Sequence, residues 1–158
     1  MFLGLTLLVL LTVQGTIGTD CPDGFESHHG TCYFFSHGEE TWIGAYEACK
    51  LFEAMLVEVN SADEDSYLSN KARSLGEYFW MSLADKQVEG EYVWETSKQS
   101  LTDTGYTNWG QNEPDAVGTE NCVFYAGSRN YQWADAECTR TENYICEKKA
   151  GGSVEVIG

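Results

Sequence analysis

The sequence predicts a single α+β domain that is held together by disulfides. Its 158 residues suit one domain, and its cysteines number an even six. Two segments in the first half repeat apolar residues at helical spacing, whereas the second half shows the short runs and alternation typical of strands. A hydrophobic content of 42% and an aromatic content of 13% exclude a wholly disordered chain.

The first predicted element is a small hairpin within residues 21–35. Turn residues occur at Pro22-Asp23-Gly24 and at Gly30, with aromatic residues beside them. The two cysteines of this segment, Cys21 and Cys32, are expected to close the hairpin with a disulfide.

Two helices follow, each preceded by the spacing of a capping box, in which a Ser and a Glu three residues later satisfy the first amides of a helix. Ser36 and Glu39 form the first box, and Ser61 and Glu64 form the second. Behind the first box, the residues at helical spacing are Trp42, Ala45, Cys49 and Phe52. Behind the second box, they are Leu68, Ala72 and Leu75.

Strands are predicted from residue 79 onward. Residues 79–83 form a short apolar run typical of a buried strand, and Tyr92 and Trp94 alternate with polar residues as in a half-buried strand. Residues 97–118 are polar and poorly patterned, and a loop of this length inside a compact domain is usually functional. Strand-like patterning returns at 123–125, 131–133 and 144–146.

The two ends of the chain are expected to lie outside the folded domain. Residues 2–13 are apolar and uncharged, but this run is shorter than the roughly 20 residues of a membrane span. With the small residues Gly15 and Gly18 behind it, residues 1–18 are predicted to be a signal peptide, which makes the protein secreted and extracellular. Residues 149–158 are expected to form a flexible tail.

The charge of the chain excludes two classes of partner. Nine Lys and Arg against 25 Asp and Glu give a net charge of −16. Nucleic acid is excluded because phosphate contacts need clustered Lys and Arg, and an anionic membrane surface is excluded for the same reason. Cations are the small partners that such a chain attracts.

The cysteines indicate disulfides, because an even number behind a signal peptide is typical of an oxidised framework. The chain also lacks the CxxC pair that would suggest a zinc site. Spacing alone leaves 15 connectivities open for six cysteines. Three histidines, His28, His29 and His37, lie near Cys21 and Cys32. A metal site there is the weaker alternative, and three solvated loop histidines are the favoured interpretation.

Four acidic residues in the second half are candidate metal ligands. Glu113, Asp115 and Glu120 lie within eight residues of the long loop, and Asp135 follows a Trp in a predicted strand. Ca²⁺ takes six to eight oxygen ligands in irregular geometry, so it suits carboxylates on a loop better than Mg²⁺ does. From composition alone, a solvated acidic loop remains the competing interpretation.

The order of motifs along the chain adds a family resemblance. In sequence they are Trp42, Ala45 and Cys49; Trp80-Met81-Ser82-Leu83; Asn108-Trp109; Glu113-Pro114-Asp115; Glu120; and Trp133-Ala134-Asp135. Together with the six cysteines, these motifs resemble the C-type lectin-like domain in its long form, over about residues 21–148. The Trp80 motif is similar to the WIGL strand of that family.

The resemblance implies a fold and a site. It implies two helices, two small antiparallel sheets, a long loop region that carries Ca²⁺ and sugar, and a cis bond before Pro114. It implies Glu113, Asp115, Glu120 and Asp135 as ligands of both Ca²⁺ and carbohydrate. The implied disulfides are Cys21–Cys32, Cys49–Cys146 and Cys122–Cys138. Asp85 and Glu89, with Glu120, match part of an auxiliary Ca²⁺ site.

The chain departs from the family pattern at two positions. The family's motifs are Glu-Pro-Asn for mannose-type and Gln-Pro-Asp for galactose-type binding, whereas this chain has the hybrid Glu113-Pro114-Asp115. The usual Trp-Asn-Asp is replaced by Trp133-Ala134-Asp135. Two amide donors to sugar are therefore absent, because an ionised carboxylate only accepts hydrogen bonds. The short loop to Glu120 favours mannose-like ligands, with broad specificity as the alternative.

The sequence thus predicts a secreted, Ca²⁺-dependent carbohydrate-binding protein that recognises glycans, for example those of microbes in innate immunity. Single sites would be weak, so avidity requires a homo-oligomer formed through the domain surface. The competing function is a matrix, adhesion or mineral-associated protein that uses the same fold without sugar. Enzyme activity is not expected, because no nucleophile motif or phosphate loop occurs.

Overall fold

The computed structural model describes residues 21–115 and 118–151. The predicted signal peptide at 1–18 and residues 152–158 of the predicted tail lie outside these residues. No helix within the described part of the chain has the length and apolarity needed to cross a membrane.

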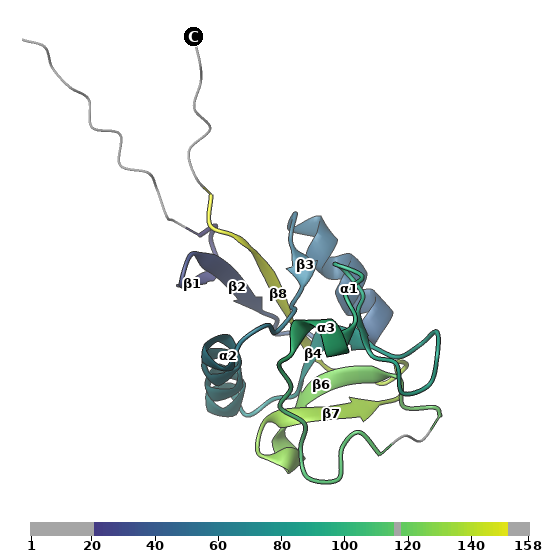
Figure 1. Cartoon of the computed structure of the whole chain (residues 1–158). Coiled ribbons are helices and arrows are strands. Elements are labelled where there is room, and N and C mark those ends of the chain that lie inside the picture. The colour runs from purple at the N-terminus through teal and green to yellow at the C-terminus, as the bar shows by residue number, and fades with distance from the viewer. Residues whose placement is uncertain (1–20, 116–117, 152–158) are drawn as a thin grey trace, which may run out of the picture.

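The hairpin predicted near the start is present and lies beside the last strand. It consists of β1 (Glu26–His28) and β2 (Thr31–Phe35), which pair in antiparallel register. Strand β2 then pairs with β8 (Asn143–Lys149), so that the first and last strands of the domain lie at one end of the molecule (Figure 1).

The remaining strands extend this hairpin into one eight-stranded sheet. They are β3 (Met55–Leu56), β4 (Phe79–Ala84), β5 (Val93–Trp94), β6 (Cys122–Ala126) and β7 (Gln132–Ala136). The order is β1-β2-β8-β4-β6-β7, with β3 beside β8 and β5 beside β4. The two antiparallel groups are joined by a parallel pairing of β4 with β8, in which Phe79 lies opposite Asn143. The sheet is therefore mixed.

Helix α1 (Trp42–Leu51) begins later than its predicted capping box. Its N-cap is Thr41, whose side chain accepts a hydrogen bond of 3.2 Å from the amide of Gly44. The predicted box was wrong because Ser36 has another partner: its hydroxyl accepts from the amide of Tyr144 on β8 at 2.9 Å. A long-range backbone contact thus outcompetes the local capping pattern.

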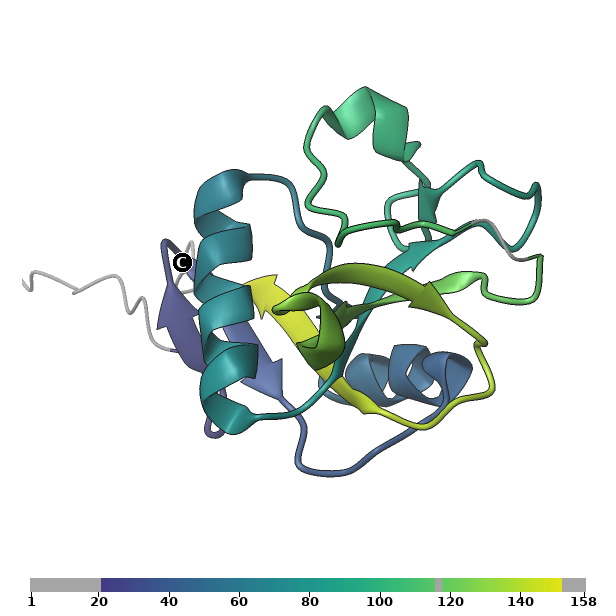
Figure 2. The same ribbon diagram turned by 90° about the horizontal axis from the view of Figure 1, so that it is seen from below.

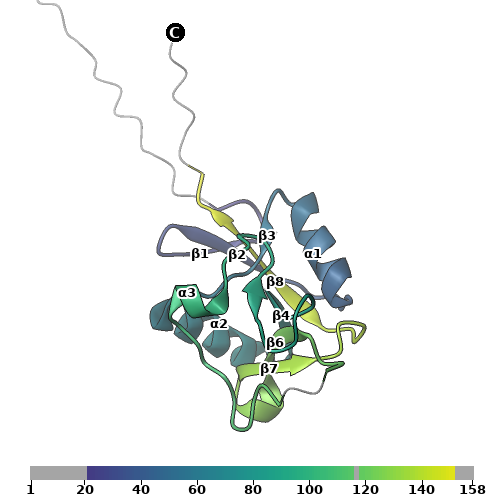
Figure 3. The same cartoon turned by 45° about the vertical axis from the view of Figure 1, so that its right-hand side comes forward.

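Helix α2 (Ala62–Leu75) begins as predicted, and Gly76 ends it in the left-handed conformation that glycine adopts readily. The Ser61 side chain accepts from the amide of Glu64 at 3.2 Å. The Glu64 carboxylate in turn accepts a hydrogen bond of 2.9 Å from the amide of Asn60, one residue before the cap. The two longer helices lie on opposite sides of β8 and β4 (Figure 3).

The polar stretch at 97–118 contains a short helix that its composition did not predict. Helix α3 (Leu101–Thr104) follows β5 and lies with the rest of this long loop above the β4–β6–β7 strands (Figure 2). Leu101 is its buried residue.

Two apolar clusters form the core, and three disulfides connect its edges. One cluster, around Leu68, Phe79 and Trp133, lies against α2, and the other, around Trp42, Trp80 and Phe124, lies against α1. The disulfides are Cys21–Cys32, Cys49–Cys146 and Cys122–Cys138, as the family resemblance implied.

A buried acid on β8 predicts how stability depends on pH. Burial is the largest cause that raises the pKa of Glu147 from 4.5 to about 8. A group whose pKa is raised in the folded state contributes stability at low pH. That contribution is lost as the pH rises through the folded pKa. We therefore expect this group to cost roughly 4 kcal/mol in the free energy of unfolding between about pH 5 and about pH 9.

Urea unfolding of the variant Glu147→Gln tests this expectation. Its amide oxygen can still accept from the amide of Glu58, which lies 2.7 Å from Glu147 Oε1. The variant should lose less stability than the wild type as pH rises. An exposed control, Glu137→Gln, should follow the wild type. Parallel pH profiles for the wild type and Glu147→Gln would contradict the expectation.

Candidate functional site

Asp135 is held by the strand pair at the end of the sheet. In the β6–β7 register it lies opposite Val123, and the Cys122–Cys138 disulfide closes the same pair. The buried Asp135 accepts a hydrogen bond of 2.8 Å on Oδ2 from the Tyr92 hydroxyl. Its Oδ1 is also buried but has no hydrogen-bonding partner within the described residues. A buried carboxylate oxygen without a donor is costly, so a cation is a fitting partner for it.

The long loop is tied to β7 by backbone hydrogen bonds. The amide of Trp133 donates to the carbonyl of Asn108 at 2.9 Å, and the amide of Gly110 donates to the carbonyl of Trp133 at 2.8 Å. Three residues after Gly110 the chain reaches the Glu113–Pro114 bond, which is cis. This anchoring places the carboxylates of the loop beside β7.

A buried aspartate on α2, which the sequence did not reveal, supports the same loop. Oδ1 of Asp65 accepts from the Tyr125 hydroxyl at 2.7 Å and from the Trp133 indole at 2.8 Å. Oδ2 accepts from the Asn108 amide at 2.6 Å and from the Tyr106 hydroxyl at 3.1 Å. An ionised carboxylate can accept all four bonds. It thereby joins α2 to the long loop, β6 and β7.

Three of the four predicted carboxylates meet in one place. Asp115, Glu120 and Asp135 each offer one oxygen, and these oxygens lie within 4.8 Å of one another. One of these three residues, Asp135, is the one that carries the buried oxygen without a donor. Converging carboxylate oxygens, on residues that include one buried oxygen without a donor, fit Ca²⁺, which binds oxygen ligands in irregular geometry.

Glu113, the fourth predicted ligand, is paired with a cation of the protein. Arg129 Nε donates to Glu113 Oε1 at 2.7 Å, and the Glu113 side chain is only 7% exposed. Gly110 makes this possible, because a Cβ there would lie 2.8 Å from the Arg129 Cβ. Arg129 was not predicted as a site residue, since the short 3₁₀ helix that carries it (Gly127–Arg129) lies outside every motif.

The acids of this group repel one another, which favours a cation. Burial is the largest cause that raises the pKa of Glu120, followed by the charge of Asp115. Burial also raises the pKa of Glu113, against the opposing effect of Arg129. Burial and the bond to Asp135 raise the pKa of Tyr92, so its hydroxyl stays a donor. A divalent ion would relieve the repulsion and favour the ionised carboxylates.

The acids of this group line a cavity of about 190 Å³. All four predicted site residues contribute to it, and Ala134 lies in its wall. Two arginines, Arg129 and Arg140, line it as well. The cavity therefore combines candidate metal ligands with residues that can donate hydrogen bonds.

The residues of the auxiliary site are not gathered in the same way. Asp85 is buried, and its Oδ2 accepts from the amide of Gly90 at 2.8 Å. Glu89 is exposed. Within residues 21–115 and 118–151, neither belongs to a group of three or more potential ligands.

Sequence and structure comparisons agree on one family. The family model described as the lectin C-type domain matches residues 38–148, which is more than half of the chain. Perlucin of Haliotis laevigata is 35% identical over 133 residues, covering 82% of this chain and 83% of perlucin. CD209 antigen-like protein C of Mus musculus is 33% identical over 135 residues, covering 85% of this chain and 73% of that protein.

A solved structure supports the same assignment. The cow C-type carbohydrate-recognition domain of CD23, crystallised in the presence of a GlcNAc2Man3 oligosaccharide, superimposes with a TM-score of 0.73. It is 33% identical, and the match covers 84% of this chain and 98% of the CD23 domain. From its sequence motifs, its fold and these similarities, the chain belongs to the C-type lectin domain family.

Proposed function

We propose that the protein is a secreted, Ca²⁺-dependent carbohydrate-binding protein. The observation that carries this proposal is the meeting of Asp115, Glu120 and Asp135 in one cavity, with the Asp135 Oδ1 buried and unpartnered. The oligosaccharide present with the related CD23 domain supports a carbohydrate ligand. We propose a role in binding and not in catalysis, because the acids of the cavity are assigned here as ligands of the ion.

The cation and the sugar share the same acidic residues in this proposal. When bound, Ca²⁺ supplies coordination positions that hydroxyl oxygens of a sugar can occupy. The carboxylates of Asp115 and Glu120 accept hydrogen bonds from those hydroxyl groups. The buried Asp135 holds its position through Tyr92 and the β6–β7 pair. Sugar binding is therefore lost with the metal.

Donors to sugar oxygens come from arginine side chains in our proposal. Asp115 and Ala134 replace the amide residues of the family pattern and donate no hydrogen bond. Arg129 and Arg140 line the same cavity, and a guanidinium group carries five N–H donors. Arg129 uses its Nε on Glu113 and Arg140 uses its Nε on Glu142, so the donors that we assign to a ligand are their terminal N–H groups. We propose mannose-like sugars with vicinal equatorial hydroxyls as the preferred ligands.

Restoring one amide tests the account of sugar binding. The variant Asp115→Asn supplies a donor beside the sugar, and one hydrogen bond contributes about 1 kcal/mol net, or roughly a fivefold gain in mannose affinity. Calorimetry in excess Ca²⁺ measures this change. Galactose is the ligand control, because its 4-hydroxyl is axial and its 3- and 4-hydroxyls are therefore not both equatorial. Unchanged or weaker mannose binding by the variant would contradict the role assigned to the missing amides.

The second candidate is a matrix, adhesion or mineral-associated protein that does not bind sugar. The Glu113–Arg129 ion pair favours it, because a Glu113 carboxylate that is paired with Arg129 is less available to coordinate Ca²⁺. A glycan array separates the two functions. Binding that disappears in EDTA supports the lectin, whereas mineral binding without any glycan signal supports the alternative.

A further inference from the structure

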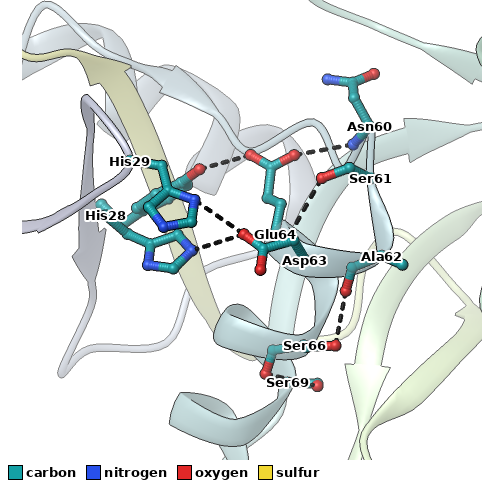
Figure 4. Close-up of polar contacts among 10 residues, drawn as sticks. His28, His29, Asn60, Ser61, Ala62, Asp63, Glu64, Ser66 and Ser69 are labelled. Atoms are coloured by element: carbon teal, nitrogen blue, oxygen red, sulfur yellow. Dashed lines mark hydrogen bonds and ion pairs between the residues drawn. The ribbon is translucent and has the colours of Figure 1, made fainter.

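A second group of potential metal ligands lies at the β1–β2 end of the molecule, away from β6 and β7 (Figure 1). It joins His28 and His29 to Asp63 on the first turn of α2. His28 Nε2 lies 3.3 Å from Asp63 Oδ2, and His29 Nδ1 lies 3.0 Å from the same oxygen. Figure 4 shows both imidazole rings facing this carboxylate. One ligand atom from each side chain lies within 4.8 Å of the others.

The hairpin turn brings the two histidines to the same side. Successive side chains of a strand point to opposite faces, so neighbouring histidines would ordinarily diverge. Here His28 pairs with Thr31, and the two residues between them turn the chain with positive φ angles of 46° at His29 and 82° at Gly30. The rings of His28 and His29 consequently stack, with centroids 4.1 Å apart and planes inclined by 16°.

Neighbouring side chains hold two of the three ligands in place. The Tyr67 ring stacks on the other face of His28, 4.1 Å between centroids and 4° between planes. The Tyr67 hydroxyl donates to Glu26, and Lys71 pairs with the same carboxylate. Asp63 lies in a helical turn fixed by the Ser61 cap. Such ordering reduces the entropy lost when an ion binds.

The sequence indicated three solvated histidines, and the structure corrects this for one of them. The His28 side chain is 22% exposed, whereas that of His29 is 74% exposed and His37 is exposed in a separate segment. The missing partner in the sequence interpretation was Asp63, which is 66% exposed and lies 35 residues after His28. An ion at this group would therefore be reachable from solvent.

The ligand types and spacings favour a metal ion between hard and soft in character, such as Zn²⁺. Two imidazole nitrogens and one carboxylate oxygen suit Zn²⁺, whereas Ca²⁺ prefers oxygen ligands. Zn²⁺ bonds of about 2.0–2.1 Å give a tetrahedral ligand-to-ligand edge of about 3.3 Å. The two distances to Asp63, 3.0 and 3.3 Å, are close to this edge. All six cysteines are in disulfides, so no thiolate competes for the ion.

We propose that His28, His29 and Asp63 form a Zn²⁺ site with three protein ligands and a fourth position open to solvent. Imidazole coordinates metal in its neutral form, and the net charge of −16 favours cation uptake. The site is independent of Ca²⁺ and of sugar, because it lies on β1, on the turn after β1 and on α2, and shares no residue with the carboxylate cavity.

Zinc titration of the full, disulfide-bonded chain tests the proposal. The protein is first stripped with chelator and then saturated with Ca²⁺, so that the acidic cavity does not take up zinc. We expect one equivalent of Zn²⁺ to bind at micromolar concentration. His29→Ala and Asp63→Asn should each weaken binding about tenfold or more, since each removes a ligand. The matched control His37→Ala should bind as the wild type does.

Ring signals of the histidines in NMR spectra supply the second measurement. Zn²⁺ should shift the signals of His28 and His29 and leave those of His37 unchanged. Absence of zinc uptake, or uptake that His29→Ala and Asp63→Asn leave unaltered, would overturn the proposal. In either case the three side chains form only an ion-paired cluster. Failure here would leave the Ca²⁺ and sugar proposal untouched.

Discussion

Replacing Asp65 with Asn should lower the free energy of unfolding by about 3 kcal/mol, the largest stability effect that we expect of one substitution. Four donors converge on the Asp65 carboxylate, from Tyr106, Asn108, Tyr125 and Trp133. The amide of Asn turns one acceptor into a donor that faces other donors in a buried position. Urea unfolding at neutral pH measures the loss.

The control for Asp65→Asn lies two residues earlier. Asp63→Asn makes the same chemical change on the same helical turn, at an exposed side chain. In metal-free buffer its effect should stay within about 0.5 kcal/mol. Similar losses for the two variants would show that the charge of the first turn matters, and would contradict a specific role for the four bonds at Asp65.

Asp135→Asn should abolish the stabilisation of the fold by Ca²⁺. A site filled at one hundred times its dissociation constant raises the free energy of unfolding by about 2.7 kcal/mol. Asn keeps an oxygen that can accept from Tyr92, so the apoprotein should remain folded. The variant lacks the negative charge that Asp135 adds to those of Asp115 and Glu120 at the ion, so it should gain little stability from Ca²⁺. Thermal unfolding with Ca²⁺ and with EDTA compares the two proteins.

Asp103→Asn serves as the matched control for this second variant. It removes one negative charge from the exposed side of α3, outside the carboxylate group. It should gain as much stability from Ca²⁺ as the wild type. An equal gain in Asp135→Asn would mean that Ca²⁺ acts through general charge screening and not through the predicted ligands.

Local patterns in the sequence predicted those elements whose signals are local. Helix α2 starts at Ser61 because the cap and its bonded amide lie three residues apart. The first helix was predicted with the wrong cap, because Ser36 bonds to Tyr144, 108 residues away. Helix α3 lies in a stretch too polar and too short to show helical periodicity.

The candidate site divides in the same way. Its acidic residues were found from a motif and from spacing, and the structure brings three of them together. Arg129 and Asp65 were missed because their roles depend on contacts across 16 residues or more. The pairing of His28 with Asp63 is likewise a product of the turn at His29 and of the packing of α2. Sequence spacing cannot show such contacts.

Direct Ca²⁺ uptake by the wild-type protein tests the central claim. After removal of bound metal by chelator, calorimetry with Ca²⁺ should show saturable uptake below millimolar concentration. The same experiment with Asp135→Asn should show none in that range. Absence of uptake by the wild-type protein at millimolar Ca²⁺ would contradict the assignment of Asp115, Glu120 and Asp135 as a calcium site.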